Sequence, residues 1–366
     1  MEKKLNIRNS LSMAGAFVAW IIGSGFATGQ EVLQFFTSYG YQSFFVVAIN
    51  LVGFVLIGYL LMQTGYDHRA LRHFNHYTFY CGPKLGRFYN LASTGILLLL
   101  LPVLLSGAGA TIEEYFGFSK PLGSAIMALL ILTAYLSGFD RLIKIVSSLG
   151  PMIIGFSLVV GLITILRDFS RFSEISTYAA ALRSKQTSAH WCISGLLYLG
   201  LNLFPGSTFI TRLGMAGVTY REVRVGAFLG AGCLMLSVAV VNTAILLHGN
   251  VTAALDIPVL YLAGRISTVL GAVFAIVLTL GIFSSSAVIM WSICSRFSRL
   301  DRRGEIIVAA SIMILGYIIS LFPFGQLIST FYPIIGYIGL VFLSCVIYRG
   351  LRRPSTSKAG NSPKIP

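Results

Sequence analysis

Long runs of apolar residues, separated by short charged and polar stretches, follow one another along nearly the whole chain. A helix needs about 20 apolar residues to cross a hydrocarbon core about 30 Å thick, and each run is close to that length. The pattern therefore predicts an all-α integral membrane protein with ten transmembrane helices. The predicted spans are residues 9–36, 41–63, 85–111, 121–138, 142–166, 187–212, 222–248, 265–295, 305–322 and 327–348.

The spans leave no stretch long enough for a soluble domain. We expect one transmembrane domain over residues 1–348, followed by a basic cytoplasmic tail over residues 349–366. The stretch from Met1 to Ser10 is short and basic and has no small-residue cleavage site, so the first helix should be retained.

The distribution of positive charge supports this number of spans. If the N-terminus is cytoplasmic, most of the 27 Lys and Arg residues fall in cytoplasmic segments, as the positive-inside rule requires. The exceptions are Lys120, Arg167, Arg171, Arg183, Lys185 and Arg265. We therefore predict a multi-pass protein of the plasma membrane, surrounded by the lipid bilayer, with both termini in the cytoplasm.

The composition excludes a soluble protein, because 56% of the residues are hydrophobic and 11% are charged, whereas soluble domains carry about 25% charged residues. The net charge of +15 reflects the cytoplasmic loops and does not indicate a nucleic-acid partner. The five cysteines are scattered, so neither a disulfide framework nor a zinc site is predicted. His68, His73 and His76 share one loop, which we interpret as a loop facing lipid head groups in preference to a metal site.

The first span contains an interruption, because three glycines, a serine and a threonine stand between Gly23 and Glu31. In lipid every backbone N–H and C=O needs a partner, so a broken helix is stable only inside protein or beside a wet cavity. Such breaks form solute sites in transporters. Glu31 is the one acid well within a span, and we expect it either to gate the outer vestibule or to bond to a neighbouring helix.

A second interruption is predicted in the sixth span, where Pro205 and Gly206 lie at mid-membrane with Asn202 and Ser207 nearby. Alone, this pattern would indicate a simple proline kink. Spans one and six, however, each open a set of five helices, and the two sets enter the membrane from opposite sides. The sequence therefore predicts a 5+5 inverted repeat, residues 9–166 and 187–348, with helices 1 and 6 broken.

The ends of broken helices indicate the chemistry of the solute. Exposed N–H groups at half-helix N-termini favour a carboxylate, and exposed carbonyl groups at C-terminal ends favour an ammonium group. We therefore expect a small amino-acid-like solute between the two breaks. The candidate solute-binding residues are Gly23, Ser24, Gly25, Phe26, Ala27, Thr28, Leu199, Asn202, Phe204 and Ser207.

With its Gly23-to-Glu31 segment and ten predicted spans, the chain resembles the LeuT fold of the amino acid–polyamine–organocation superfamily, and more narrowly the YkvI-like membrane proteins. The resemblance implies a sodium ion held by carbonyl groups near Ala19 and Ile22 and by hydroxyl groups of Ser285 with either Ser284 or Ser286. No other cofactor is implied. Proton-coupled relatives carry a lysine from span five at that place, and Lys144 keeps this alternative open.

These observations predict a secondary active transporter that moves its solute by symport with a cation, sodium being favoured. Proton coupling and a non-transporting solute sensor remain alternatives. A channel would need a continuous polar stripe or a charged ring, and an enzyme would need a nucleophile with its base, or metal ligands, at membrane depth; neither pattern is present. The sequence does not indicate which solute is moved or the oligomeric state.

Overall fold

The computed structural model describes residues 6–22, 24–71, 74–136, 139–297 and 301–352, with the backbone alone for Ser24 and residues 139–151. Nearly all of these residues are helical. The long helices are α4 (Ser43–Asp67), α5 (His76–Phe116), α7 (Phe139–Asp168), α9 (Trp191–Met215), α10 (Tyr220–Leu246), α13 (Thr268–Cys294), α14 (Arg302–Ser320) and α15 (Phe324–Leu351). The shorter helices are α1 (Ile7–Ile21), α2 (Ser24–Thr28), α3 (Gln30–Phe35), α6 (Lys120–Leu136), α8 (Ala179–Arg183), α11 (Gly249–Thr252) and α12 (Pro258–Ile266), with the 3-10 segments η1 (Thr37–Gln42), η2 (Phe169–Tyr178) and η3 (Ser295–Phe297).

Within the described residues, 8 helices are long and apolar enough to cross a membrane. The two other predicted spans correspond to α6, which has 17 residues, and to the α1–α3 segment, in which the longest helix has 15. The number of ten spans therefore stays a prediction. The third predicted span began at residue 85, whereas α5 begins at His76 and changes direction at Gly82, where φ is +75°.

The first predicted span is divided into three helices. Helix α1 ends at Ile21, and the Ile22 N–H still donates to the Val18 carbonyl at 2.8 Å before α2 begins at Ser24. A second turn, at Gly29 with φ +83°, separates α2 from α3. A Cβ atom at Gly29 would lie 2.7 Å from Cγ2 of Val259 in α12, so both the left-handed conformation and the close packing require glycine.

The predicted break in the sixth span is wrong, because α9 is one continuous helix from Trp191 to Met215 with Pro205 inside it. Proline removes a single backbone hydrogen bond from a helix. On either side of Pro205 the helix is held by close packing, since Gly200 contacts the backbone of α15 and Gly214 contacts the backbone of α4. The Ser207 hydroxyl also donates to the Phe204 carbonyl at 2.7 Å, within the disturbed turn.

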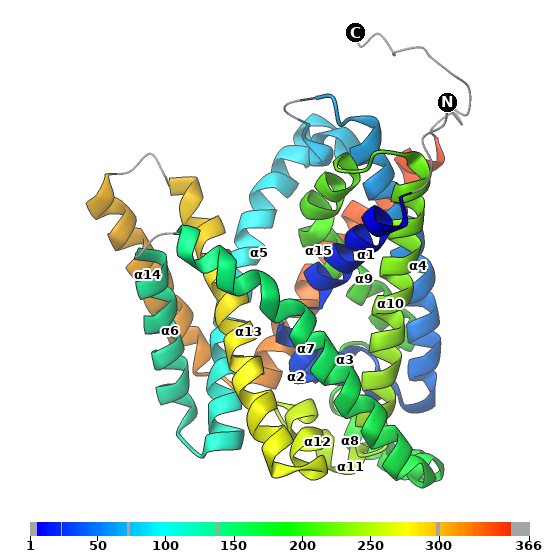
Figure 1. Cartoon of the computed structure of the whole chain (residues 1–366), viewed down its shortest axis with the longest axis vertical. Coiled ribbons are helices and arrows are strands. Elements are labelled where there is room, and N and C mark those ends of the chain that lie inside the picture. Colours follow the sequence, from blue (N-terminus) through cyan, green and yellow to red (C-terminus); the bar gives the residue numbers. More distant parts are fainter. Residues whose placement is uncertain (1–5, 23, 72–73, 137–138, 298–300, 353–366) are drawn as a thin grey trace.

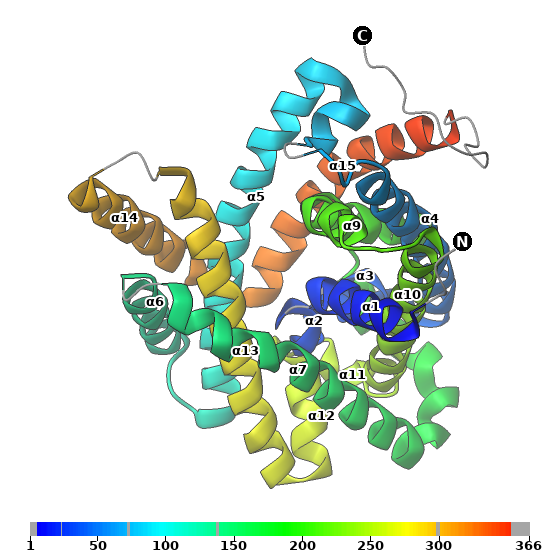
Figure 2. The same ribbon diagram turned by 45° about the horizontal axis from the view of Figure 1, so that its top comes forward.

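Most of the helices form two groups, and the interruption between α1 and α2 lies between these groups. Helices α1, α4, α9 and α10 pack together, and α5, α6, α13 and α14 form the second group (Figure 1). Helix α15 joins the groups through α9 and α5, and α7 joins them through α10 and α13 (Figure 2). Helix α1 packs mainly on α10 and α9, whereas α2 packs on α13, α5 and α7, so the chain passes from one group to the other at the interruption.

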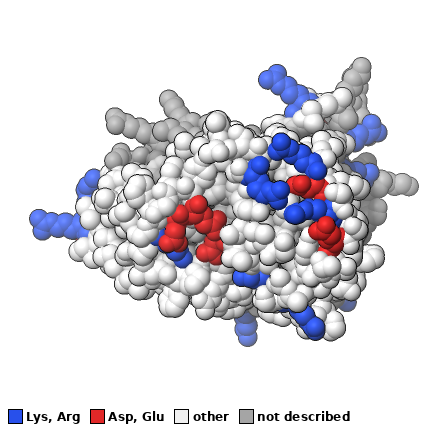
Figure 3. Space-filling model, turned by 90° about the horizontal axis from the view of Figure 1, so that it is seen from below, with Lys and Arg blue, Asp and Glu red and all other residues white. Residues whose placement is uncertain are grey.

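The two ends of the molecule differ. The start of α1 and the end of α15 lie at one end, and the short helices α8, α11 and α12 lie at the opposite end (Figure 1). Viewed from this opposite end, the surface is largely uncharged, and acidic side chains gather in one group while basic side chains surround acidic ones in another (Figure 3). Charge is therefore concentrated at particular places on this end of the molecule.

Candidate solute site

The Glu31 side chain is buried beside the interrupted first segment, and the residue is 7% exposed. Its carboxylate lies directly against Gly25 of α2, where an added Cβ atom would overlap with Oε1 of Glu31. The Tyr332 hydroxyl of α15 bonds to this carboxylate, and it lies 3.2 Å from the same Cβ position. Tyr198 of α9 is fully buried, and it lies close enough to Glu31 for the two side chains to interact electrostatically. Three helices therefore converge on one buried carboxylate.

The local sequence explains how Glu31 reaches Gly25. The Thr28 hydroxyl donates to the Gly25 carbonyl at 2.6 Å and accepts a hydrogen bond from the Gln30 N–H at 3.2 Å. One side chain thus serves the end of α2 and the start of α3, as serine and threonine do at turns. With the left-handed Gly29 between them, the chain turns sharply enough to bring the Glu31 side chain back onto α2.

Two glutamines of α3 extend this site towards the start of α15. Gln34 Nε2 donates to the Gly325 carbonyl at 2.8 Å. Gln30 is 0% exposed, and neither polar atom of its side chain has a hydrogen-bond partner within the described chain. A buried amide without partners is costly in a native structure. Gln30 is therefore a candidate to contact a ligand.

The residues predicted to bind solute on the first segment have different environments. Gly23 lies outside the described residues, and the Ser24 side chain is likewise not described. Phe26 and Ala27 are buried in the hydrophobic core. Gly25, with Thr28, is part of the turn around Glu31.

The structure does not bring the predicted residues of α9 to this turn as a group. Leu199 packs against Gly53 of α4. Phe204 lies among aromatic rings of α5 and α15, including Tyr77, Tyr89 and Phe342. Ser207 bonds to His76 at 2.9 Å. Asn202 is half-buried and donates to the Tyr198 carbonyl at 3.0 Å, so it is the predicted α9 residue associated with a member of the Glu31 site.

The residues predicted to bind sodium lie on two elements. On α13, which packs against α2, the Ser286 hydroxyl is buried and has no hydrogen-bond partner among the residues that the structure describes. Ser285 is half-buried. At the end of α1, Ile22 is buried and Ala19 is exposed. Lys144, the residue behind the proton alternative, lies where only the backbone is described.

The histidine loop does not form a metal centre in the described part of the chain, where no group of three or more His, Cys, Asp or Glu side chains could hold a metal ion. His68 bonds to the Thr64 carbonyl at 2.9 Å, and His76 is buried beside Ser207. His73 lies outside the described residues.

Sequence reasoning did not assign a role to Tyr198, Tyr332 or Gln30. Tyr198 stands four residues before Asn202, so the helical repeat could have placed the two side by side. Tyr332 is separated from Glu31 by most of the chain, and no local pattern distinguishes it from other tyrosines. Gln30 directly precedes Glu31, and an uncharged amide beside an acid gives no separate signal in the sequence.

Comparison with known proteins shows the class of fold. No family model matches the chain. A membrane protein of Bacillus subtilis named YkvI is 28% identical over 336 residues, which cover 92% of this chain and 94% of that protein. The YyaD protein of the same organism is 23% identical over 329 residues, which cover 89% of this chain and 93% of its own length.

Two solved structures have a similar backbone. The inward-facing conformation of Mhp1 has a TM-score of 0.56 and 13% identity, and the match covers 95% of this chain and 78% of Mhp1. A Na⁺-coupled sialic acid symporter in its substrate-bound outward-open state has a TM-score of 0.51 and 14% identity, with 94% of this chain and 86% of the symporter covered. The resemblance to YkvI-like membrane proteins is therefore confirmed, and the chain has the LeuT fold.

Proposed function

We propose that this relative of YkvI, a multi-pass membrane protein with the LeuT fold, is a secondary active transporter. It moves a small amino-acid-like solute across the plasma membrane together with a cation, and sodium is the favoured cation. In this proposal the ten spans form two inverted sets of five, both termini are cytoplasmic, and the site is exposed alternately to the two sides. The protein is not proposed to catalyse a chemical reaction.

The observation that carries the proposal is the Glu31 carboxylate at the interrupted segment. An acidic group costs roughly 2.5 to 3.5 kcal/mol near the centre of a membrane helix, and such residues normally belong to solute or ion pathways. No Lys, Arg or His side chain among the described residues forms an ion pair with Glu31. Because α9 is continuous, the Leu199 carbonyl is engaged within the helix, and Pro205 withdraws a donor only from the Leu201 carbonyl. We therefore assign Glu31 as the partner of the ammonium group of the solute, which extends its predicted gating role.

Support for sodium comes from α13. Uncharged hydroxyl and carbonyl oxygens suit a hard monovalent cation. The Ser286 hydroxyl supports this choice, because it is buried and unpaired within the described chain, on a helix that packs against α2.

A specific observation also favours proton coupling as a second candidate. A buried carboxylate that has a tyrosine hydroxyl as its partner can accept and release a proton during each cycle. Glu31 has this environment, with Tyr332 as the bonded group. Under this alternative Glu31 carries the proton, and Ser286 has no role in coupling.

Uptake into proteoliposomes tests these proposals. A panel of amino acids and amines is offered under separate sodium and proton gradients. Under sodium coupling, Ser286→Ala should raise the sodium concentration for half-maximal uptake at least tenfold. Ser292→Ala should not, because this half-buried serine of the same helix donates its hydroxyl to the Val288 carbonyl at 2.7 Å. Under proton coupling, Glu31→Gln should abolish proton-driven uptake, whereas Ser286→Ala should take up the solute at the wild-type rate.

Two results would contradict the proposal. Unchanged sodium-driven uptake in both Ser285→Ala and Ser286→Ala would reject the assigned sodium ligands. Saturable binding of a solute without uptake under either gradient would identify a sensor and would refute transport.

A further inference from the structure

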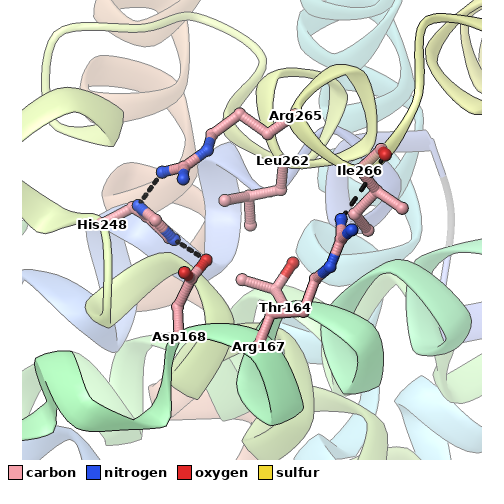
Figure 4. A pocket seen from close by; sticks show the side chains of 7 residues that line it. All are labelled: Thr164, Arg167, Asp168, His248, Leu262, Arg265 and Ile266. Carbon is pink, nitrogen blue, oxygen red and sulfur yellow. Dashed lines mark hydrogen bonds and ion pairs between the residues drawn. The ribbon is translucent and has the colours of Figure 1, made fainter.

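A cavity of about 450 Å³ lies at the end of the molecule where Figure 1 shows α12, opposite the start of α1, and no residue of the Glu31 site lines it. We call it the arginine pocket. Its walls come from the last turns of α7, from the turn after α10 and from α12 (Figure 4). The lining residues are Thr164, Arg167, Asp168, His248, Leu262, Arg265 and Ile266.

His248 is the centre of the hydrogen-bonding network in the arginine pocket. Its side chain is 0% exposed, and its Nε2 lies 2.9 Å from Oδ2 of Asp168. Its Nδ1 lies 2.8 Å from a guanidinium nitrogen of Arg265 and 2.8 Å from one of Arg171 (Figure 4 shows the Arg265 and Asp168 contacts). A guanidinium group can only donate, so Nδ1 is the acceptor and the Nε2–H donates to Asp168. His248 is therefore neutral in this arrangement.

The positive charge of the pocket is not balanced by the described residues. Arg167, Arg171 and Arg265 carry three positive charges, and Asp168 is the one acid among the lining residues. None of the three guanidinium groups forms an ion pair with a carboxylate in the described ranges. Glu174, in the same segment as Arg171, accepts a hydrogen bond from the Tyr178 hydroxyl.

Two of these positive charges are held unusually close together. The guanidinium nitrogens of Arg171 and Arg265 both lie 2.8 Å from the same histidine nitrogen, so they can be no further apart than twice that distance. Like charges at such a distance repel each other, and an anion between or beside them relieves the repulsion. Each guanidinium group also has further N–H donors in a planar fork that matches two oxygens of a carboxylate or phosphate.

We infer that the arginine pocket binds an oxyanion, a carboxylate or phosphate group, with Arg265 and Arg167 as direct ligands and His248 as the neutral group that positions Arg171 and Arg265. The cavity volume falls within the range of about 300–1,000 Å³ that is typical of small-ligand sites. Leu262 and Ile266 give it an aliphatic wall, which suits an anion attached to a short carbon chain. The inference is independent of the proposed transport function.

The pocket is connected to the interrupted segment through α12. This helix carries Arg265 and Leu262 near its end and Val259 near its start, and Val259 packs against Gly29. An oxyanion that bridges Arg167 of α7 and Arg265 of α12 would therefore hold α12 in place over the turn between α2 and α3.

Thermal unfolding of the purified full-length protein in a neutral detergent tests this inference. The probe is inorganic phosphate, with sodium chloride of equal ionic strength as the salt control. We expect a saturable rise in melting temperature with phosphate beyond that in chloride. Arg265→Gln and Arg167→Gln should each weaken the apparent affinity at least tenfold, whereas Arg183→Gln, at an exposed arginine of α8, should match the wild type.

The melting temperature without phosphate separates binding from folding. If Arg265 acts as a ligand, Arg265→Gln should unfold without phosphate at the wild-type temperature or above it, because a repulsive charge has been removed. Equal phosphate responses in the wild type and both pocket variants, or a phosphate response no larger than that of chloride, would overturn the inference.

A second arm identifies the source of the oxyanion. The same proteins are titrated with succinate and, separately, with phosphatidylglycerol in mixed micelles. A response to succinate and phosphate that requires Arg265 and Arg167 indicates a soluble oxyanion. A response to phosphatidylglycerol alone with the same dependence indicates a lipid head group.

Discussion

Replacement of Gly29 by alanine should destabilise the protein through two separable effects. Gly29 has φ +83°, and holding an alanine in this left-handed region costs about 1–2 kcal/mol. Its new Cβ would also meet Val259 Cγ2 at 2.7 Å and Ile245 Cδ1 at 3.0 Å, and overpacking of this kind costs about 1–3 kcal/mol. The expected loss in the free energy of unfolding is therefore about 2–5 kcal/mol.

Gly117 supplies the matched control. It has φ +73° at the end of α5, and a Cβ there would meet nothing within 4 Å, so Gly117→Ala should lose only the first effect, about 1–2 kcal/mol. The assay is unfolding in mixed detergent micelles, followed by circular dichroism. In the double variant Gly29→Ala with Val259→Ala, part of the packing cost should be recovered. If Gly29→Ala loses no more stability than Gly117→Ala, Val259 of α12 does not pack closely against Gly29.

Other predictions concern the two sites. Gly25→Ala should leave stability nearly unchanged, because the flexible end of Glu31 can move away. It should nevertheless reduce uptake at least tenfold, because the Glu31 carboxylate is displaced. Gly15→Ala, where a Cβ meets nothing within 4 Å, should reduce neither stability nor uptake. Burial lowers the pKa of His248 below its usual 6.5, and the nearby charges of Arg265 and Arg171 act in the same direction, whereas Asp168 opposes them. The unfolded chain therefore binds a proton that the folded protein excludes, so stability should fall as the pH decreases through about 6.5, and His248→Gln should flatten this part of the stability–pH profile. An identical profile in His248→Gln would refute the neutral histidine.

Much of the fold could be predicted from the sequence because a membrane constrains each helix separately. Apolar runs of fixed length must be helical to satisfy their backbone, so long helices such as α4, α10 and α13 lie close to their predicted spans. The end of α1 at Ile21 follows from the same argument, because Gly23 and Gly25 weaken the helix locally. Tertiary packing could not be predicted in this way. The continuity of α9 through Pro205 depends on contacts with α4 and α15, which no local pattern reveals.

The candidate sites show the same limit. Glu31 could be identified because a carboxylate in a span is rare, but its partner Tyr332 comes from the far end of the chain. The arginine pocket combines residues that precede and follow α9, so its arginines were predicted only as separate residues on the outer side of the membrane. A residue such as Glu31 can be identified from its own sequence position, whereas a residue such as Tyr332 can be identified only once the fold brings it beside a partner far away in the sequence.

The close approach of α9 to its neighbours restricts how this sequence can diverge. A Cβ at Gly200 would lie against the Gly336 carbonyl of α15, a Cβ at Gly339 against the Gly200 carbonyl, and a Cβ at Gly214 against the Met62 carbonyl of α4. Backbone atoms cannot move aside as side chains do, so even alanine would wedge these helices apart. Substitutions of lipid-facing side chains should therefore be tolerated far more readily than substitution of these glycines by any larger residue.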